Sequence, residues 1–502
     1  MGASIKMDVG VAGLGVVVLW CVLAGVGAIR TKPSSFVRML NVRRAEVVFG
    51  IGVLAYLALF AATATWVGVG DGHKVVSADK SSYLGPFVLG KLAKLCLALM
   101  YLPVLRYPGL DRWVAGRVLP FERRLKFHRV FGAVFLTVAS AHGAWMAIRT
   151  KFGHFSVGGV SLAGAVALGL FAVMGVGALP TIRRHHFGVF RALHWLQVPA
   201  VIAALVHVPG IALYLAVPGS LWLALLLART VRAWRGRRRA KLSVLPGEAT
   251  EISLMWPHEW AAPRPGSYAF LRVGSVAWAA WHPFSVVDFE PSTRHVRFIV
   301  KVVHHTHAQS WTAKLHALAE RGASPSIWID GAYGELSLSH AALAQCSHVV
   351  LVAGGVGVTP MASILQHVAD TEADSVQRVT FVWTSRSMAD VCTPWIGSTL
   401  EHAGRVLGPR LTTSFFHSAP PPSRSISSSS SDSASSSSSA IATFEWTPGR
   451  PDLDQLLAEV QATGSPARAV LVAVCGPPSL CDAAIAAGTE HGFTVHVETF
   501  RF

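Results

Sequence analysis

The chain has 502 residues, 52% of them hydrophobic, and a mean hydropathy of +0.45, which excludes an ordinary soluble enzyme and leaves room for two or three domains. Its 44 basic and 27 acidic residues give a net charge of +17, but the basic residues cluster at the ends of apolar segments, as in the loops of membrane proteins. We therefore expect membrane lipid, and not nucleic acid, as the partner of this charge.

Apolar segments of membrane-spanning length fill the first 230 residues. Seven of them are predicted, over residues 8–29, 46–70, 84–105, 127–148, 157–179, 187–208 and 211–229. The first also resembles a signal peptide, but its apolar run is long for one and no A-x-A cleavage pattern follows it. We therefore interpret it as a span.

The loops between these segments alternate in charge. Loops such as "RTKPSSFVRMLNVRR" and "TIRRHHFGVFR" are rich in Arg and Lys, whereas the alternate loops "DGHKVVSADKSS" and "RTKFGHFS" carry fewer basic residues. By the positive-inside rule, the N-terminus lies outside and everything after residue 230 lies in the cytosol. The plasma membrane is the default location of such a multi-pass protein.

After residue 235, the composition of the chain is that of soluble domains. Short strands such as "EISLMW" and "HVRFIVKVV" predict a small antiparallel barrel over residues 236–340. From 341 to 502, the apolar strands "HVVLVAGG", "RVTFVWTS" and "RAVLVAVCG" alternate with helices and predict an α/β domain with a parallel sheet. A serine-rich insertion at about 418–442 cannot pack a core and is expected to be disordered. The predicted fold is thus a helical transmembrane domain, residues 1–235, followed by these two domains.

Two of the predicted spans carry two histidines each. His128 and His142 are fourteen residues apart, and His194 and His207 are thirteen apart, which is about 20 Å along a helix. Both spans run from the cytosol outwards, so His128 and His194 share an inner level, and His142 and His207 an outer level. Facing imidazoles at two levels predict the axial ligands of two b-type haems. A zinc site and a proton relay are the alternatives.

The helical phase supports one pair more directly than the other. Fourteen residues return to within about 40° of the starting direction, whereas thirteen miss it by about 140°. Pro199 lies between His194 and His207, and a proline kinks or locally rewinds a helix. We therefore expect a distortion near Pro199, and a straight helix there would count against the stacked pairs.

A glycine-rich turn in "VLVAGGVGVTPMASIL" joins a strand to a helix and predicts a phosphate-binding site. Its candidate ligand-binding residues are Gly354, Gly355, Gly357, Thr359 and Pro360. Arg386 follows the next strand, and no acidic residue follows that strand directly, which favours NADPH over NADH.

Two further turns are candidates. Cys475, Gly476 and Pro477 end the third strand at the carboxyl edge of the sheet, where ligands bind in open α/β sheets. In the barrel, "WHPFSVV" contains His282, Pro283, Phe284 and Ser285. These residues suit a flavin, although the same stretch is also an ordinary strand start.

Taken together, these features resemble the ferric reductase and NADPH oxidase family of transmembrane flavocytochromes, over nearly the whole chain from about residue 85. The four membrane histidines match the family's haem ligands one for one. The family's other motifs follow in order: HPF(T/S) at His282–Ser285, DGPYG at Asp330–Gly334 with Ala332 in place of proline, GGxGxTP at Gly354–Pro360 and CGPP at Cys475–Pro478.

The resemblance implies further cofactor-binding residues. Trp311 and Thr312 match an aromatic-Thr element that helps to hold the FAD pyrophosphate, but His304, His305 and His307 replace the glycine-bearing stretch ahead of it. The alternative is that this loop is polar and has no role in binding a ligand.

The C-terminal element of the family also has a counterpart here. Family members end in a Glu-x-aromatic element whose ring stacks on the flavin. Glu498 and Phe500 match it, with Phe502 as the alternative ring. Phe500 and Cys475 are therefore the candidate catalytic residues.

The resemblance predicts an NADPH-dependent ferric-chelate reductase with FAD and two b-type haems. An additional span before the six-helix core and the absence of calcium-binding loops favour ferric iron over oxygen as the acceptor. Superoxide production is the alternative, and a transporter or proton channel that uses the histidines is a remote one. Lys91 and Lys94 are predicted to meet haem propionates or an anionic chelate, or else to snorkel towards the outer surface. Protein partners are not predicted.

Overall fold

The structure is a computed structural model that divides into two compact units, Met1–Ala228 and Arg229–Phe502. It describes residues 84–110, 121–149, 160–264, 266–302, 310–334, 343, 345–371, 376–386, 394–418 and 445–498. Several predictions lie outside these residues: the spans 8–29 and 46–70, the serine-rich segment after Ser418, the three loop histidines, and the terminal Phe500 and Phe502.

The described part of the first unit is helical. Its helices are α5 (Leu84–Leu99), α6 (Pro108–Leu110), α7 (Phe121–Arg149), α8 (Val160–Gly177), α9 (Pro180–His185), α10 (Phe187–His194), α11 (Gln197–His207) and α12 (Ile211–Arg235), the last of which continues into the second unit. Each of the five predicted segments from residue 84 onward contains a described helix, but α5 ends at Leu99, before the predicted residue 105, and a break divides the segment 187–208. Three described stretches are long and apolar enough to cross a membrane: Arg124–Ile148, Phe187–His207 and Ile211–Arg235. The total of seven spans stays a prediction.

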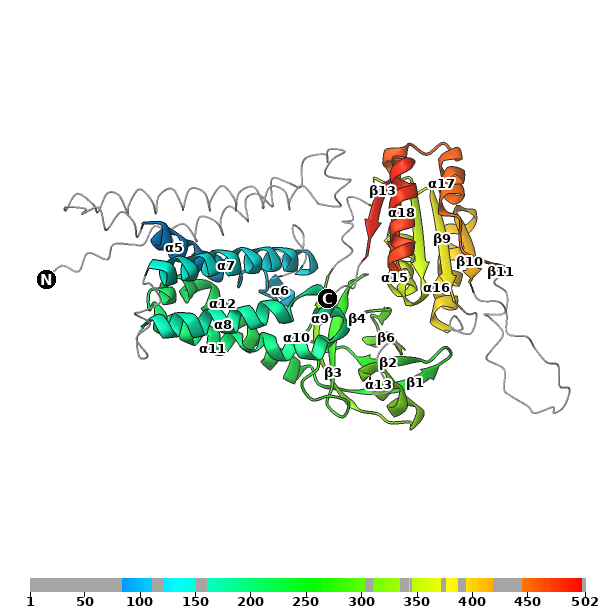
Figure 1. The fold of residues 1–502 in the computed structure, drawn as a ribbon. Helices are drawn as coiled ribbons and strands as arrows, with labels where there is room; N and C mark the ends of the chain where they lie inside the picture. The colour runs from blue at the N-terminus through cyan, green and yellow to red at the C-terminus, as the bar shows by residue number, and fades with distance from the viewer. Residues whose placement is uncertain are drawn as a thin grey trace. The chain divides into compact units, whose positions relative to one another are not determined.

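The bundle packs apolar side chains on both its inner and its outer surface. Inside, α5 lies along α7 and α8 lies along α11 (Figure 1), with Phe135 and Phe171 in edge-to-face contact. Outside, Val198, Ile202 and Val206 of α11 are 47%, 56% and 62% exposed. Such a stripe would be unfavourable in water and suits a helix in contact with lipid.

The expected distortion near Pro199 is present as a break between α10 and α11 at Trp195 and Leu196. Pro199 has no N–H and cannot donate to the carbonyl of Trp195, four residues before it. The amide of Val198 donates to that carbonyl instead, over 3.2 Å, and the amide of Leu196 donates to Leu193 O over 3.0 Å. Bonds of this 3-10 type rotate the chain about 20° more per residue, so three or four residues recover about 60–80° of the phase mismatch.

The second unit begins with an antiparallel sheet. Its strands are β1 (Arg238–Leu245), β2 (Ala249–Met255), β3 (Tyr268–Val273), β4 (His282–Ser285), β5 (Asp288–Glu290), β6 (His295–Lys301) and β7 (Ser326–Tyr333), in the order β4-β3-β7-β1-β2-β6-β5. Helix α13 (Trp311–Glu320) buries Leu315 against a core that contains Trp256, Leu271 and Phe298. The antiparallel sheet agrees with the prediction, while its closure into a barrel stays a prediction.

A parallel sheet follows in the same unit. Its strands are β8 (His348–Gly354), β9 (Arg378–Ser385), β10 (Leu411–His417), β11 (Trp446–Pro448), β12 (Val470–Cys475) and β13 (Thr494–Val497), in the order β11-β10-β9-β8-β12-β13. The three predicted strands are β8, β9 and β12, and they are neighbours in the middle of the sheet, parallel as expected.

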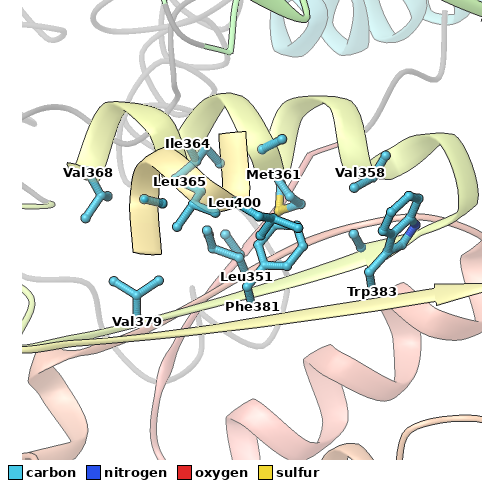
Figure 2. Packing of buried hydrophobic residues seen from close by; sticks show 14 of the residues in the cluster. Leu351, Val358, Met361, Ile364, Leu365, Val368, Val379, Phe381, Trp383 and Leu400 are labelled. Carbon is cyan, nitrogen blue, oxygen red and sulfur yellow. The ribbon is translucent and has the colours of Figure 1, made fainter. Parts of the chain in front are cut away.

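Helices cover both faces of this sheet (Figure 1). α15 (Val358–Thr371) and α16 (Pro394–Leu407) pack on one face, and α17 (Leu453–Ala462) and α18 (Pro478–Glu490) pack on the other. Figure 2 shows Met361, Leu365 and Leu400 from the first pair of helices packed over Leu351 and Phe381 of the strands. Because both faces are covered, the strands are continuous apolar runs, which is why they were recognisable in the sequence.

Short 3-10 turns complete the described elements of this part of the chain. They are η3 (Gly355–Gly357), η5 (Gly408–Arg410) and η6 (Ala467–Ala469). The first of them contains the glycines of the predicted phosphate-binding turn and connects β8 to α15.

Candidate functional site

The order in which the chain adds strands to the parallel sheet reverses between β8 and β12. From β8 the chain proceeds through β9, β10 and β11 on one side, and then returns to place β12 and β13 on the other side. The two predicted turns, Gly354–Gly357 and Cys475–Pro477, lie at the ends of β8 and β12. After the two turns, the chain continues into helices on opposite faces of the sheet, α15 after β8 and α18 after β12. The carboxyl edge at such a point is where open α/β sheets bind ligands.

The glycines of the two turns are required by close backbone contacts. A Cβ atom on Gly357 would lie 2.3 Å from the carbonyl oxygen of Cys475, and one on Gly354 would lie 2.7 Å from Cδ of Pro477. Gly355 has a φ of +56°, a conformation that side chains disfavour. These residues therefore keep the two loops in contact and leave their backbone open to a ligand.

A cavity of about 910 Å³ lies at this edge, between the parallel and antiparallel sheets of the second unit. Eleven predicted site residues line it: Pro283, Phe284, Ser285, Gly354, Gly355, Gly357, Thr359, Arg386, Cys475, Gly476 and Pro477. The structure thus brings the predicted flavin motif and both predicted nucleotide turns to one space. His282, Thr312 and Pro360 are not in its lining, and Pro360 is buried in α15.

Two basic residues of the cavity were not predicted. Lys301 ends β6, and Arg450 follows β11, so that with Arg386 three cationic side chains line the space. A ligand that carries phosphate groups matches this charge. The sequence did hold a signal for Arg450, because Pro448, Gly449 and Pro451 around it are typical of a loop.

Cys475 is a buried part of the cavity wall. Burial raises the pKa of its thiol, and the neighbouring Glu498 and Cys481 raise it further. The thiol therefore stays protonated at neutral pH and is a poor nucleophile, which fits a contact with a bound cofactor better than covalent chemistry. Glu498 also lines the cavity; its Oε1 lies 2.8 Å from Nε2 of His496, and its amide donates to Val474 O.

The predicted flavin motif lies against the predicted aromatic-Thr element. The ring of Trp311 lies 4.4 Å from that of His282 and 5.6 Å from that of Phe284, in the second case nearly parallel. Ser310 caps the start of α13 by accepting from the amide of Ala313, which fixes the position of Trp311. Two motifs that are 26 residues or more apart in the sequence therefore form one aromatic cluster.

The Asp330–Gly334 motif is held by arginines from the basic stretch that follows the last predicted span. Arg229 donates from Nε and Nη2 to Oδ2 of Asp330 over 3.1 and 2.9 Å, and the hydroxyl of Tyr333 donates to Oδ1. Arg232 donates to the carbonyl of Gly331 over 2.7 Å. All these residues belong to the second unit, and Asp330 is only 2% exposed. The contacts satisfy a buried carboxylate at the end of β7.

In the first unit, the rings of His128 and His194 are neighbours, with their centres 6.0 Å apart and their planes inclined by 65°. A metal bound by both rings would lie about 2 Å from each coordinating nitrogen, with each ring centre about 1 Å behind that nitrogen. The separation therefore leaves room for one metal ion between the two rings, so His128 and His194 would fit as a pair of ligands to one haem iron. Within the described residues, no cluster of three or more His, Cys, Asp or Glu side chains is present that could hold a metal ion.

The two histidines of α7 are oriented by backbone carbonyls. Nδ1 of His128 lies 3.0 Å from Met100 O, and Nδ1 of His142 lies 2.7 Å from Pro86 O. A carbonyl only accepts hydrogen bonds, so each Nδ1 carries the proton and each Nε2 keeps a lone pair for a metal.

The rings of His142 and His207 each pack against a glycine. A Cβ atom on Gly90 would lie 3.2 Å from His142 Cε1, and one on Gly164 would lie 2.7 Å from His207 Cε1. Their pairing as ligands of one haem stays a prediction.

The two lysines of α5 have aromatic neighbours. Nζ of Lys91 lies 5.0 Å from the ring centre of Phe87, and Nζ of Lys94 lies 5.2 Å from that of Tyr214. These cation–π contacts accommodate both ammonium groups inside the protein.

Three family models match the chain in consecutive stretches. Residues 89–205 match the ferric reductase like transmembrane component, residues 234–337 match an FAD-binding domain, and residues 346–486 match the ferric reductase NAD binding domain.

The chain is also similar to individual proteins. It is 28% identical to "Ferric reduction oxidase 7, chloroplastic" of Arabidopsis thaliana, over 66% of this chain and 47% of the relative. It is 23% identical to a superoxide-generating NADPH oxidase heavy chain of Dictyostelium discoideum, over 67% of this chain and 57% of the relative. The chain spans about half the length of the curated relatives it matches.

Among solved structures, a ferredoxin NADP+ reductase from Neisseria gonorrhoeae with bound FAD and NADP has a TM-score of 0.37 and 14% identity, over 52% of this chain and 97% of that chain.

The contact between the two nucleotide turns gives a testable prediction. In Gly357→Ala, the new methyl group meets the Cys475 carbonyl and forces the turns apart, so we expect kcat/KM for the nicotinamide nucleotide to fall about 100-fold. The matched control is Gly404→Ala in α16, where a Cβ atom meets nothing within 4 Å. Nucleotide titrations of the detergent-solubilised chain measure the effect, and equal behaviour of the two variants would contradict it.

Proposed function

Because the chain belongs to the ferric reductase and NADPH oxidase family, we propose that it transfers electrons from cytosolic NADPH, through FAD and two b-type haems, to a ferric chelate on the opposite side of the membrane. The observation that carries this proposal is the common cavity of the second unit. Hydride transfer needs two ligands in contact, and the cavity is lined both by Pro283–Ser285 and by the turns at Gly354–Gly357 and Cys475–Pro477.

The proposed roles of the residues follow from their positions. The turns after β8 and β12 bind the nucleotide through exposed backbone groups, while Arg386, Lys301 and Arg450 offer positive charge to its phosphates. The HPFS motif would hold the flavin, with His282 and Phe284 supported by Trp311. Thr312, at the start of α13, and Phe500 are the further family-matched contacts.

Histidines at two levels would hold the haems. His128 and His194 are the proposed ligands of the inner haem, and His142 and His207 those of the outer haem. When bound, flavin accepts two electrons as a hydride and releases them singly, and each haem carries one. The role of the protein would be to orient each ligating nitrogen and keep its lone pair available. The carbonyls of Met100 and Pro86 would do this for His128 and His142 of α7.

The acceptor is the part of the proposal with a competing candidate. Similarity to a ferric reduction oxidase supports ferric iron, and similarity to a superoxide-generating oxidase supports oxygen. Ferric-chelate reduction is our first proposal because five Arabidopsis relatives named ferric reduction oxidases are 26–28% identical to this chain. The superoxide-generating oxidase is 23% identical. The cytosolic orientation, the outside N-terminus and the plasma membrane remain part of the proposal.

The choice of acceptor is tested by NADPH-driven reduction of a ferric chelate with and without superoxide dismutase. We expect an unchanged rate, because the chelate takes electrons directly. Complete loss of reduction with dismutase would favour the oxidase.

In the same assay, an unchanged chelate KM and haem spectrum in Lys91→Ala and Lys94→Ala would exclude a functional role for these lysines.

Arg386 is expected to select NADPH. Removal of one charge-assisted phosphate contact costs about 1.5–3 kcal/mol, so Arg386→Ala should raise KM for NADPH about 10-fold or more and leave KM for NADH unchanged. Arg378→Ala is the matched control, because Arg378 is at the opposite end of the same strand, β9. An equal rise for both nucleotides in Arg386→Ala would mean that the side chain does not bind the 2′-phosphate.

A further inference from the structure

Helix α5 contacts both histidines of α7 through main-chain oxygen atoms. His142 donates to Pro86 O near the start of α5, and His128 donates to Met100 O directly after its end. Carbonyls at a helix C-terminus lack a partner within the helix, so Met100 O is free to accept from a side chain.

The two acceptors on α5 have the same spacing in the sequence as the two histidines on α7. Pro86 and Met100 are fourteen residues apart, and so are His128 and His142, in the reverse order along the chain. Two antiparallel helices that pack side by side keep such equal offsets in register, because both rise about 1.5 Å per residue. Helix α5 thus carries two acceptors at the spacing of the two proposed haem levels.

Gly90 makes the contact near the start of α5 possible. It lies one helical turn after Pro86, and a Cβ atom there would lie 3.2 Å from Cε1 and 3.3 Å from Nδ1 of His142. The missing side chain leaves a notch through which the imidazole reaches the Pro86 carbonyl. A methyl group at position 90 would require the ring to shift by a few tenths of an ångström, which disturbs the geometry of its bond to the acceptor.

His194 and His207 lie on two further helices, α10 and α11. Nδ1 of His194 is buried and has no hydrogen-bond partner in the described part of the chain. The ring of His207 packs on Gly164 of α8, where a Cβ atom would lie 2.7 Å from it. Each proposed haem would therefore have one ligand from α7 whose Nδ1–H is bonded to a carbonyl and one ligand from α10 or α11.

We propose that α5 is a positioning element for the haem ligands, in which the carbonyls of Pro86 and Met100 orient His142 and His128 and raise their basicity, and Gly90 gives His142 access to its acceptor. This inference rests on the proposed function, because it assumes that these histidines ligate haem. Pro86, Met100 and Gly90 are positioning residues that act through the histidines. A hydrogen-bonded imidazole is a stronger electron donor to iron and favours its oxidised state.

The test is Gly90→Ala in the full chain, purified with its haems and titrated potentiometrically. The added methyl group weakens the bond from His142 to Pro86 O, so the midpoint potential of one haem, the outer one, shifts upwards and its low-spin EPR signal moves, while the other haem is unchanged. Gly169→Ala is the matched control, because a Cβ atom there meets nothing within 4 Å. A normal haem content with both potentials unshifted, or a shift of the inner haem alone, overturns the proposal.

Gly164→Ala gives an independent arm of the same experiment. Its methyl group displaces His207, and if His142 and His207 share the outer haem, both glycine variants alter the same signal. Alteration of different haems overturns the pairing and with it the assignment of an outer level to α5. Absence of any b-type haem in the unaltered chain would instead refute the proposed function.

A measurement on the unaltered chain covers the case in which Gly90→Ala does not assemble. At least two of the four ligand Nδ1 protons, those of His128 and His142, then exchange slowly with D2O in ENDOR spectra of the oxidised haems. Uniformly rapid exchange overturns the proposal.

Discussion

The hydrogen bonds from the α7 histidines to the carbonyls of α5 are the interactions on which the membrane part of the structure depends. An imidazole in an apolar bundle is costly unless its polar atoms have partners. Because a carbonyl accepts from Nδ1 and fixes the tautomer, Nε2 keeps its lone pair, and the ring of His194 lies beside that of His128, with the ring centres 6.0 Å apart. In the proposed function, the helix pairing, the glycine notches and the break before α11 would bring the histidines to two common levels.

A comparable constraint organises the second unit. There, the backbones after β8 and β12 touch so closely that Gly357 admits no side chain beside the Cys475 carbonyl. The cavity lies beside this contact, at the point where the strand order reverses, and the residues of both turns line it. The antiparallel sheet supplies the opposite wall with Phe284 and Lys301. Both units therefore use the absence of a Cβ atom to let a group approach where a cofactor is proposed to bind.

The parts that were predictable from sequence are those in which one physical signal dominates. Apolar length revealed the described membrane helices, continuous apolar runs revealed β8, β9 and β12, and Pro199 predicted a break that occurs at Trp195 and Leu196. Strand β1 was missed because its start, "RRAK", continues the basic loop after the last span. The same loop interpretation hid Arg229, whose pairing with Asp330 joins residues 101 positions apart. Such contacts depend on tertiary folding, which local patterns do not encode.

The central claim is that two haems are held by histidines paired by level, and difference spectra of single-histidine variants test it most directly. The reduced-minus-oxidised spectrum of the unaltered chain should show two b-type haems. His128→Ala and His194→Ala should each lose the same one of them, and the double variant should lose no more than either single variant. Absence of b-type haem from the unaltered chain, or loss of different haems in the two variants, would contradict the account.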